Sequence, residues 1–169
     1  MLTLYNVLSS DGFIATKDGG EDFIPDEVWG DFLELCTKHD AIILGKNAYT
    51  AIQSFDKELV APFEKLSIHK IIVTRDKNFK PKNGYSVINS LREAATLYPN
   101  MLLSSGPGLN TAFLNEKLID RIILNKLPVK IGEGITQFEQ GVSPKLTATP
   151  ELNINKANGR MLAFYKVIY

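Results

Sequence analysis

Residues 102–138 read LLSSGPGLNTAFLNEKLIDRIILNKLPVKIGEGITQF, and this stretch decides the fold of the chain. A short apolar run at 101–103 predicts a buried strand, the glycine turn 104–108 follows it, and apolar residues then predict a helix and another strand at 119–124. The start of such a helix offers unpaired N–H groups and the positive end of its dipole, which favour a phosphate. A glycine turn after a strand is weak evidence taken alone, so an ordinary tight turn is the alternative.

Two other strand ends carry glycine or basic residues. The tetrapeptide Gly45-Lys46-Asn47-Ala48 stands where the apolar strand 41–44 gives way to a helix, and Gly45 would allow a close backbone approach. Arg75 follows the strand predicted at 69–74, and its guanidinium group could donate two hydrogen bonds to an anion. Taken alone, each of these basic side chains is better explained as a solvated residue.

The composition predicts a single soluble domain over residues 1–169, because 44% hydrophobic residues suffice for one sizeable core. The 19 basic and 19 acidic residues balance without long runs, which argues against binding to nucleic acid or an anionic membrane. No apolar run approaches the roughly 20 residues of a membrane span, so we expect a cytoplasmic protein without signal peptide or anchor. Cys36 is expected to be buried, and the histidines lack partners at metal-ligand spacing, so no metal site is expected.

The predicted elements alternate between strand and helix, as a mainly parallel α/β sheet requires. Strands are expected at 2–8, 41–44, 69–74, 85–88, 101–103 and 119–124, and helices at 26–38, from 47, at 90–98 and from 109. Three antiparallel strands are expected at 145–149, 151–155 and 161–169. A turn near Asn158-Gly159 would join the last two of them into a hairpin.

Three motifs in order resemble one protein family. Residues 102–138 resemble the pattern E-G-G-x-x-L, L-V-D-E-L, P-V-x-L-G-x-G-x-x-L-F of the C-terminal reductase domain of the riboflavin-biosynthesis enzyme RibD. Ser9–Ala15 looks like its S-L-D-G-x-I-A segment, and Asp40–Tyr49 looks like D-A-I-L-V-G-R-x-T-Y. The resemblance covers nearly all of the chain and implies the dihydrofolate-reductase-like α/β fold. That fold has a mostly parallel central sheet flanked by helices, with an antiparallel C-terminal hairpin.

The resemblance also implies an NADPH-dependent oxidoreductase, in which the cofactor carries the chemistry and the fold aligns the reactants. Lys46 would then lie near the adenosine 2′-phosphate, and Thr74-Arg75 near the same phosphate or the adenine. The implied cofactor-binding residues are Gly45, Lys46, Asn47, Ala48, Thr74, Arg75, Ser105, Gly106, Pro107, Gly108 and Leu109.

The implied substrate-binding residues are Asp11, Asp22, Phe23 and Ser104, because Gly20-Glu21-Asp22-Phe23 resembles the family's G-E-S-x-W segment with one residue missing. Dihydrofolate reductases place a carboxylate near the start of their first helix to bind the pterin and assist protonation. Glu27 or Asp26 resembles that catalytic residue. The alternative is that both acidic residues only stabilise the N-terminus of the helix.

Two departures from the family pattern limit the prediction. Ser104-Ser105-Gly106 replaces Glu-Gly-Gly, whose paired glycines form an unusual backbone corner, and Ala48 replaces a phosphate-binding threonine. Three hypotheses therefore stand. The first is an NADPH-dependent reductase of a pyrimidine- or pterin-like substrate, with 5-amino-6-(5-phosphoribosylamino)uracil as the leading candidate. The second is dihydrofolate reduction, and the third is a non-catalytic nucleotide-binding protein.

The resemblance further implies a homodimer. The apolar strand 161–169 would either take part in the dimer interface or lie inside the sheet.

Overall fold

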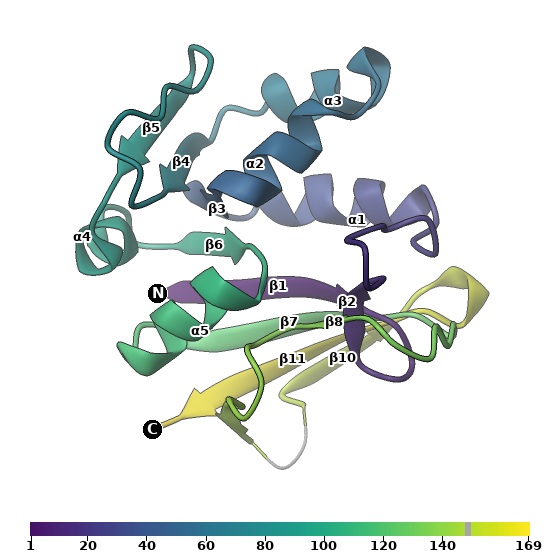
Figure 1. Ribbon diagram of the computed structural model, residues 1–169. Helices are drawn as coiled ribbons and strands as arrows, with labels where there is room; N and C mark the ends of the chain where they lie inside the picture. Colours follow the sequence, from purple (N-terminus) through teal and green to yellow (C-terminus); the bar gives the residue numbers. More distant parts are fainter. Residues whose placement is uncertain (148–149) are drawn as a thin grey trace.

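The computed structural model describes residues 1–147 and 150–169, and within them the chain forms a nine-stranded sheet and a two-stranded ribbon (Figure 1). The strand order in the large sheet is β10-β11-β7-β1-β6-β3-β4-β5, with β9 also paired to β11. Its strands are β1 (Leu2–Leu8), β3 (Ala41–Gly45), β4 (His69–Val73), β5 (Tyr85–Ile88), β6 (Met101–Ser104), β7 (Arg121–Lys126), β9 (Lys145–Leu146), β10 (Leu152–Asn155) and β11 (Met161–Ile168). The ribbon pairs β2 (Phe13–Ala15) with β8 (Ile135–Thr136).

The strand directions confirm the predicted fold class. Strands β1 and β3 to β7 run parallel to one another, and β9, β10 and β11 pair antiparallel. Strand β11 lies between β10 and β7, so 161–168 occupies the interior of the sheet. Residues 148–149 of the strand predicted at 145–149 lie outside the described residues.

Five helices of the described chain cover the two faces of the sheet: α1 (Glu27–Cys36), α2 (Lys46–Gln53), α3 (Lys57–Glu64), α4 (Leu91–Thr96) and α5 (Pro107–Asn115). Helices α1, α2 and α3 pack on one face, whereas α4 and α5 pack on the other (Figure 1). Sequence analysis missed α3, because Pro62 inside it is a helix-breaking signal. It also missed the short ribbon strands β2 and β8.

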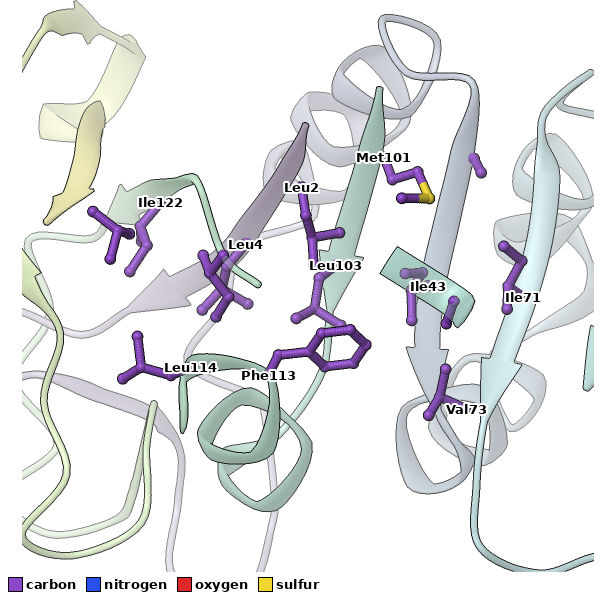
Figure 2. Packing of buried hydrophobic residues seen from close by; sticks show 14 of the residues in the cluster. Leu2, Leu4, Ile43, Ile71, Val73, Met101, Leu103, Phe113, Leu114 and Ile122 are labelled. Carbon is purple, nitrogen blue, oxygen red and sulfur yellow. The ribbon is translucent and has the colours of Figure 1, made fainter. Parts of the chain in front are cut away.

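Alternating residues of each strand supply the core, as a sheet covered on both faces requires. Figure 2 shows the layer under α5, where Leu2 and Leu4 of β1 meet Leu103 of β6 and Phe113 of the helix. Cys36 is fully buried, as expected, and burial raises the pKa of its thiol to about 12. No helix among the described residues is both long and apolar enough to cross a membrane.

The chain turns in opposite directions after the neighbouring strands β3 and β6. From β3 it continues through α2 and α3 to β4, whereas from β6 it passes through α5 on the other face to β7 (Figure 1). The carboxyl ends of two such strands leave a crevice between them, and this is where open α/β sheets bind ligands.

Candidate active-site cleft

A cavity of about 690 Å³ opens at this switch point of the sheet. Its walls come from the end of β1, the loop between β2 and α1, the starts of α1 and α2, the turn after β6, and β8. Side chains far apart in the sequence therefore meet in one cleft. The volume is in the range of small-molecule and cofactor sites.

Two helix starts form part of the cleft. Asn47 and Ala48 of α2 line it together with Ser105, Gly106 and Pro107 at the start of α5. The residues that precede these helices, Gly45 and Gly106, are glycines, and no side chain caps either helix. The backbone N–H groups of both first turns are thus free of capping side chains, and they point to an anion site on each helix.

Gly45 lets the two helix starts approach each other. A Cβ atom at this position would lie 2.7 Å from Ser105 Oγ and 3.4 Å from Leu109 Cδ2. Any larger residue would require Ser105 to move, because side chains do not approach this closely. The pairing of β3 with β6 therefore brings three of the predicted cofactor residues close together: Gly45, Ser105 and Leu109.

A buried network of side-chain amides fixes the turn after β6 through hydrogen bonds. The carbonyl O of Ser105 accepts hydrogen bonds from Asn6 Nδ2 and Asn110 Nδ2, both at 3.0 Å. Asn6 Oδ1 in turn accepts from Asn110 Nδ2 at 3.1 Å and from Gln137 Nε2 at 3.0 Å. Gly106 is extended (φ −87°, ψ −179°), a conformation open to any residue. The described residues contain only trans peptide bonds.

An aromatic wall forms another part of the cleft. Trp29 and Phe32 of α1 line it with Tyr5 of β1 and Phe55 after α2. The ring centroids of Trp29 and Phe32 are 5.2 Å apart, those of Tyr5 and Phe32 are 5.7 Å apart, and those of Trp29 and Phe55 are 5.4 Å apart. Sequence analysis missed this wall. The apolar spacing of α1 indicates a buried face, but it does not say that part of this face borders a cleft.

Three carboxylates also line the cleft: Glu21, Asp22 and Asp26. Desolvation by neighbouring atoms raises the pKa of Glu21, although much of the residue is exposed to solvent. Asp26 directly precedes α1, and Glu27 is the first residue of that helix but does not line the cleft. Of the predicted substrate residues, Asp22 and Ser104 lie in the cleft wall, whereas the half-buried Phe23 does not.

Asp11 takes part in a different set of contacts. Its carboxylate accepts hydrogen bonds from Ser9 Oγ and Gly132 N, both at 2.7 Å, and from Ile131 N at 3.2 Å. Desolvation alone would raise the pKa of Asp11, but these hydrogen bonds outweigh it and the pKa lies below its ordinary value. Asp11 therefore ties the loop after β1 to the loop before β8, outside the cleft wall.

The basic residues expected at the cofactor lie beside the cleft rather than in its wall. Lys46 Nζ pairs with Asp76 Oδ2 at 2.8 Å and lies 5.1 Å from the centre of the Phe79 ring. Thr74 Oγ1 accepts a hydrogen bond from Asp76 N at 3.1 Å. Arg75 is exposed, and no ion pair involves it within residues 1–147 and 150–169. Gly108 is exposed and also stands outside the wall.

Comparisons with known proteins show which solved structures share this architecture. No family model matches the sequence. A curated relative, the uncharacterized protein YwjB of Bacillus subtilis, is 26% identical over 149 residues, which cover 81% of this chain and 82% of the relative. A protein of Shewanella described as a riboflavin biosynthesis protein superposes with a TM-score of 0.77 at 20% identity, and 99% of each chain is covered.

Two further solved structures extend the comparison. A pyrimidine reductase-like protein of Corynebacterium diphtheriae has a TM-score of 0.73 at 16% identity, covering 99% of this chain and 92% of the other. The dihydrofolate reductase of Enterococcus faecalis, in complex with NADP(H) and RAB-propyl, has a TM-score of 0.70 at 15% identity, covering 100% and 97%. The chain has the dihydrofolate-reductase-like fold.

Within this dihydrofolate-reductase-like fold, the cleft combines two different chemical environments. The free amides of α2 and α5 can bind phosphate groups, and the partly exposed ring of Trp29 on α1 can stack on a planar ligand. Among the described residues, no group of three or more potential metal ligands gathers. The arrangement suits a bound dinucleotide next to a flat organic substrate.

Proposed function

We propose that this protein is an NADPH-dependent reductase of a planar, pyrimidine- or pterin-like substrate. One observation carries the proposal: a single cleft joins two uncapped helix starts to an aromatic wall at the switch point of the sheet. The shared fold with a dihydrofolate reductase that binds NADP(H) supports the choice of cofactor.

The residues present fit a dinucleotide beside the two helix starts that line the cleft. The absence of a side chain at Gly45 keeps the turns after β3 and β6 close together, so N–H groups of both helices can bind its phosphates. Lys46 and Arg75 would bind the adenosine 2′-phosphate, with Lys46 exchanging Asp76 for the ligand. NADPH would supply the hydride, while the protein orients the rings and excludes water.

Two specific reactions are candidates. Reduction of 5-amino-6-(5-phosphoribosylamino)uracil is supported by structural likeness to proteins described by riboflavin biosynthesis and pyrimidine reduction. Dihydrofolate-type reduction is supported by the carboxylate of Asp26 in an aromatic cleft, where it can hold a ring N–H or deliver a proton. A non-catalytic scaffold would favour a filled or collapsed cleft, so the open cavity argues against it.

Cofactor binding provides the first test. Trp29 is the only tryptophan in the chain and lines the cleft, so its fluorescence should be quenched saturably by NADPH. The substitution Arg75→Ala should raise the Kd for NADPH about tenfold or more, because a charge-assisted hydrogen bond is worth roughly 1.5–3 kcal/mol. The Kd for NADH, which lacks the 2′-phosphate, should not change.

The matched control for this test is Lys80→Ala, which removes an exposed cation from the same loop. It should leave both dissociation constants unchanged. Absence of any saturable response to NADPH at millimolar concentration would refute the proposed cofactor.

We also propose that the protein forms a homodimer through the outer edge of β10. This strand is the last in the sheet, and its apolar residues Leu152 and Ile154 are 51% and 39% exposed. An exposed edge strand with apolar side chains is a template for pairing with another strand. Two copies can satisfy both edges by antiparallel pairing about a twofold axis.

The substitution Ile154→Lys should convert the dimer to a monomer, because it places a charge in the contact. Sedimentation velocity at micromolar concentration would measure the change in mass. Leu97→Lys, which alters a 45% exposed residue at the end of α4, should leave the dimer intact. A monomeric wild-type protein would disprove the proposed assembly.

A further inference from the structure

We propose that Ser105 binds a phosphate of the cofactor through its hydroxyl group, and that the buried carboxamides of Asn6 and Asn110 position the peptide bond that follows it. This inference rests on the proposed function and deepens it, because it assigns groups that would hold the pyrophosphate common to NADPH and NADH. It comes from a hydroxyl group without a partner and from the hydrogen bonds made by the neighbouring carbonyl group.

The Ser105 side chain is buried but lacks a hydrogen-bond partner. The residue is 8% exposed and lines the cleft, and no hydrogen bond within residues 1–147 and 150–169 involves its Oγ atom. A buried hydroxyl group without a partner destabilises a fold, and alanine would fill the same space without this cost. The family pattern has glycine at this position, so the hydroxyl group is a feature of this chain.

This hydroxyl group lies between two helix starts. A Cβ atom on Gly45, the residue before α2, would be 2.7 Å from Ser105 Oγ, and Ser105 is itself followed by Gly106, the residue before α5. The missing side chain of Gly45 therefore leaves room for Oγ beside the start of α2. Because no side chain caps either helix, a phosphate placed there could accept hydrogen bonds from the hydroxyl group and from the N–H groups of both first turns.

The N–H of Gly106 is a further donor at this point. Gly106 lines the cleft, and among the described residues no carbonyl or side chain accepts a hydrogen bond from its nitrogen. The carbonyl and the N–H of a trans peptide point in opposite directions. Because the carbonyl of Ser105 is directed toward buried side chains, the N–H of Gly106 is directed away from them. Fixing this carbonyl therefore fixes the direction of the donor.

Asn6 and Asn110 hold the carbonyl of Ser105. Each donates to it through Nδ2 at 3.0 Å, and the two residues are 8% and 0% exposed. Asn110 Nδ2 also lies 3.1 Å from Asn6 Oδ1 and 2.9 Å from the carbonyl O of Gln137. All three neighbours of this nitrogen are acceptors, so they determine the orientation of the carboxamide. Asn110 Oδ1 is buried without a partner in the described chain, so this side chain is not explained by stability alone.

The substitution Ser105→Ala tests the contact with the phosphate. It should raise the Kd about tenfold or more for NADPH and by the same factor for NADH, because both ligands lose a hydrogen bond to their pyrophosphate. Quenching of Trp29 measures both constants. Arg75→Ala should weaken the binding of NADPH alone. Unchanged constants in Ser105→Ala, or a change for NADPH only, would overturn the assignment.

Inorganic pyrophosphate tests the positioning role without the cofactor. In isotope-labelled wild-type protein followed by amide NMR, pyrophosphate should shift the Gly106 resonance saturably, because the free N–H becomes hydrogen-bonded to the anion. Asn110→Leu leaves the carbonyl of Ser105 with one of its two donors. The shift should then be smaller, and pyrophosphate should bind about threefold or more weakly than to the wild type.

Thr111→Val is the matched control. Thr111 is the next residue of α5 and is 4% exposed, and its Oγ1 accepts a hydrogen bond from Glu139 N at 2.9 Å but makes none to the turn. This variant also loses a buried polar contact of α5, yet it should keep the wild-type shift and affinity. If Asn110→Leu does not fold, Gln137→Leu, which removes a donor to Asn6 from a half-buried position, should reduce the shift in the same direction.

The outcomes separate this inference from the proposed function. Failure of NADPH and NADH to bind the wild type would refute the proposed cofactor, and the pyrophosphate titration would still decide whether a phosphate binds beside Ser105. A Gly106 resonance that does not move at millimolar pyrophosphate would overturn the phosphate site. Equal effects of Asn110→Leu and Thr111→Val would overturn the positioning role.

Discussion

Replacement of Asp31 by asparagine is expected to lower the free energy of unfolding by about 3–5 kcal/mol, because it leaves a buried arginine without its partner. Asp31 lies on α1, and its side chain is 10% exposed. One carboxylate oxygen pairs with Lys156 at 3.0 Å, and the other pairs with Arg160 and accepts from Asn125 Nδ2 at 3.4 Å. Asn125 also donates to Tyr5 Oη at 3.2 Å, so the network joins α1, the C-terminal hairpin and the cleft floor.

The contribution of Asp31 should depend on pH in a defined direction. Desolvation alone would raise the pKa of Asp31, but hydrogen bonds and charge from Lys156 and Arg160 lower it below the ordinary value. A group with a lowered folded-state pKa stabilises the fold above its unfolded pKa, about 3.9, and this stabilisation fades as the pH falls through the folded-state pKa. Urea denaturation followed by Trp29 fluorescence should therefore show a constant difference in stability between variant and wild type from neutral pH to about pH 5, and a difference that shrinks as the pH falls below about 4.

Two controls identify the cause of the loss. Glu34→Gln removes a carboxylate from the same helix, but its pair with Lys38 is well exposed, so the loss of stability should be much smaller than for Asp31→Asn. The double variant Asp31→Leu, Arg160→Met removes both buried charges and should be more stable than Asp31→Asn. A loss for Asp31→Asn no greater than that for Glu34→Gln would show that the buried pair does not hold the hairpin to α1.

Local sequence patterns predicted the large sheet because the apolar residues of each strand are consecutive in the sequence. Runs such as 41–44 and 119–124 are apolar enough to be buried on both faces, and glycine turns mark their ends. The helix expected at 90–98 is present as α4, and its N-cap residue Ser90 accepts a hydrogen bond through Oγ from Glu93 N at 3.3 Å. The motif order then indicated the dihydrofolate-reductase-like fold, which the structural comparisons confirm.

The composition of the cleft depends on contacts between residues far apart in the sequence, which local sequence patterns do not predict. Arg160 and Asp31 are 129 residues apart, and neither position signals its partner. Lys46 was expected to face the cofactor, yet Asp76, 30 residues further on, holds its ammonium group. Successive residues of a helix point about 100° apart, so the pattern around α1 could not separate Asp26, which lines the cleft, from Glu27, which does not.

Replacement of Gly134 by alanine is expected to open one wall of the cleft. A Cβ atom on Gly134 would lie 2.2 Å from the carbonyl O of Ala15 and 3.1 Å from Phe13 Cβ, so backbone atoms must separate. Gly134 directly precedes β8, which pairs with β2, and Ala15 and Ile135 of this ribbon line the cleft. We expect a loss of about 1–3 kcal/mol in unfolding free energy, together with weaker quenching of Trp29 by NADPH and by cleft ligands.

The comparison with Gly132 separates crowding from backbone strain. Gly132 has a φ of +85°, and a Cβ atom there would meet nothing within 4 Å. Gly132→Ala should therefore cost about 1–2 kcal/mol through its left-handed conformation while leaving the ribbon in place and ligand affinity unchanged. Because the two variants then lose similar stability, only the ligand titration distinguishes them. If Gly134→Ala kept wild-type affinity for NADPH, the close approach of β8 to β2 would not shape the cleft, and the ribbon would serve stability alone.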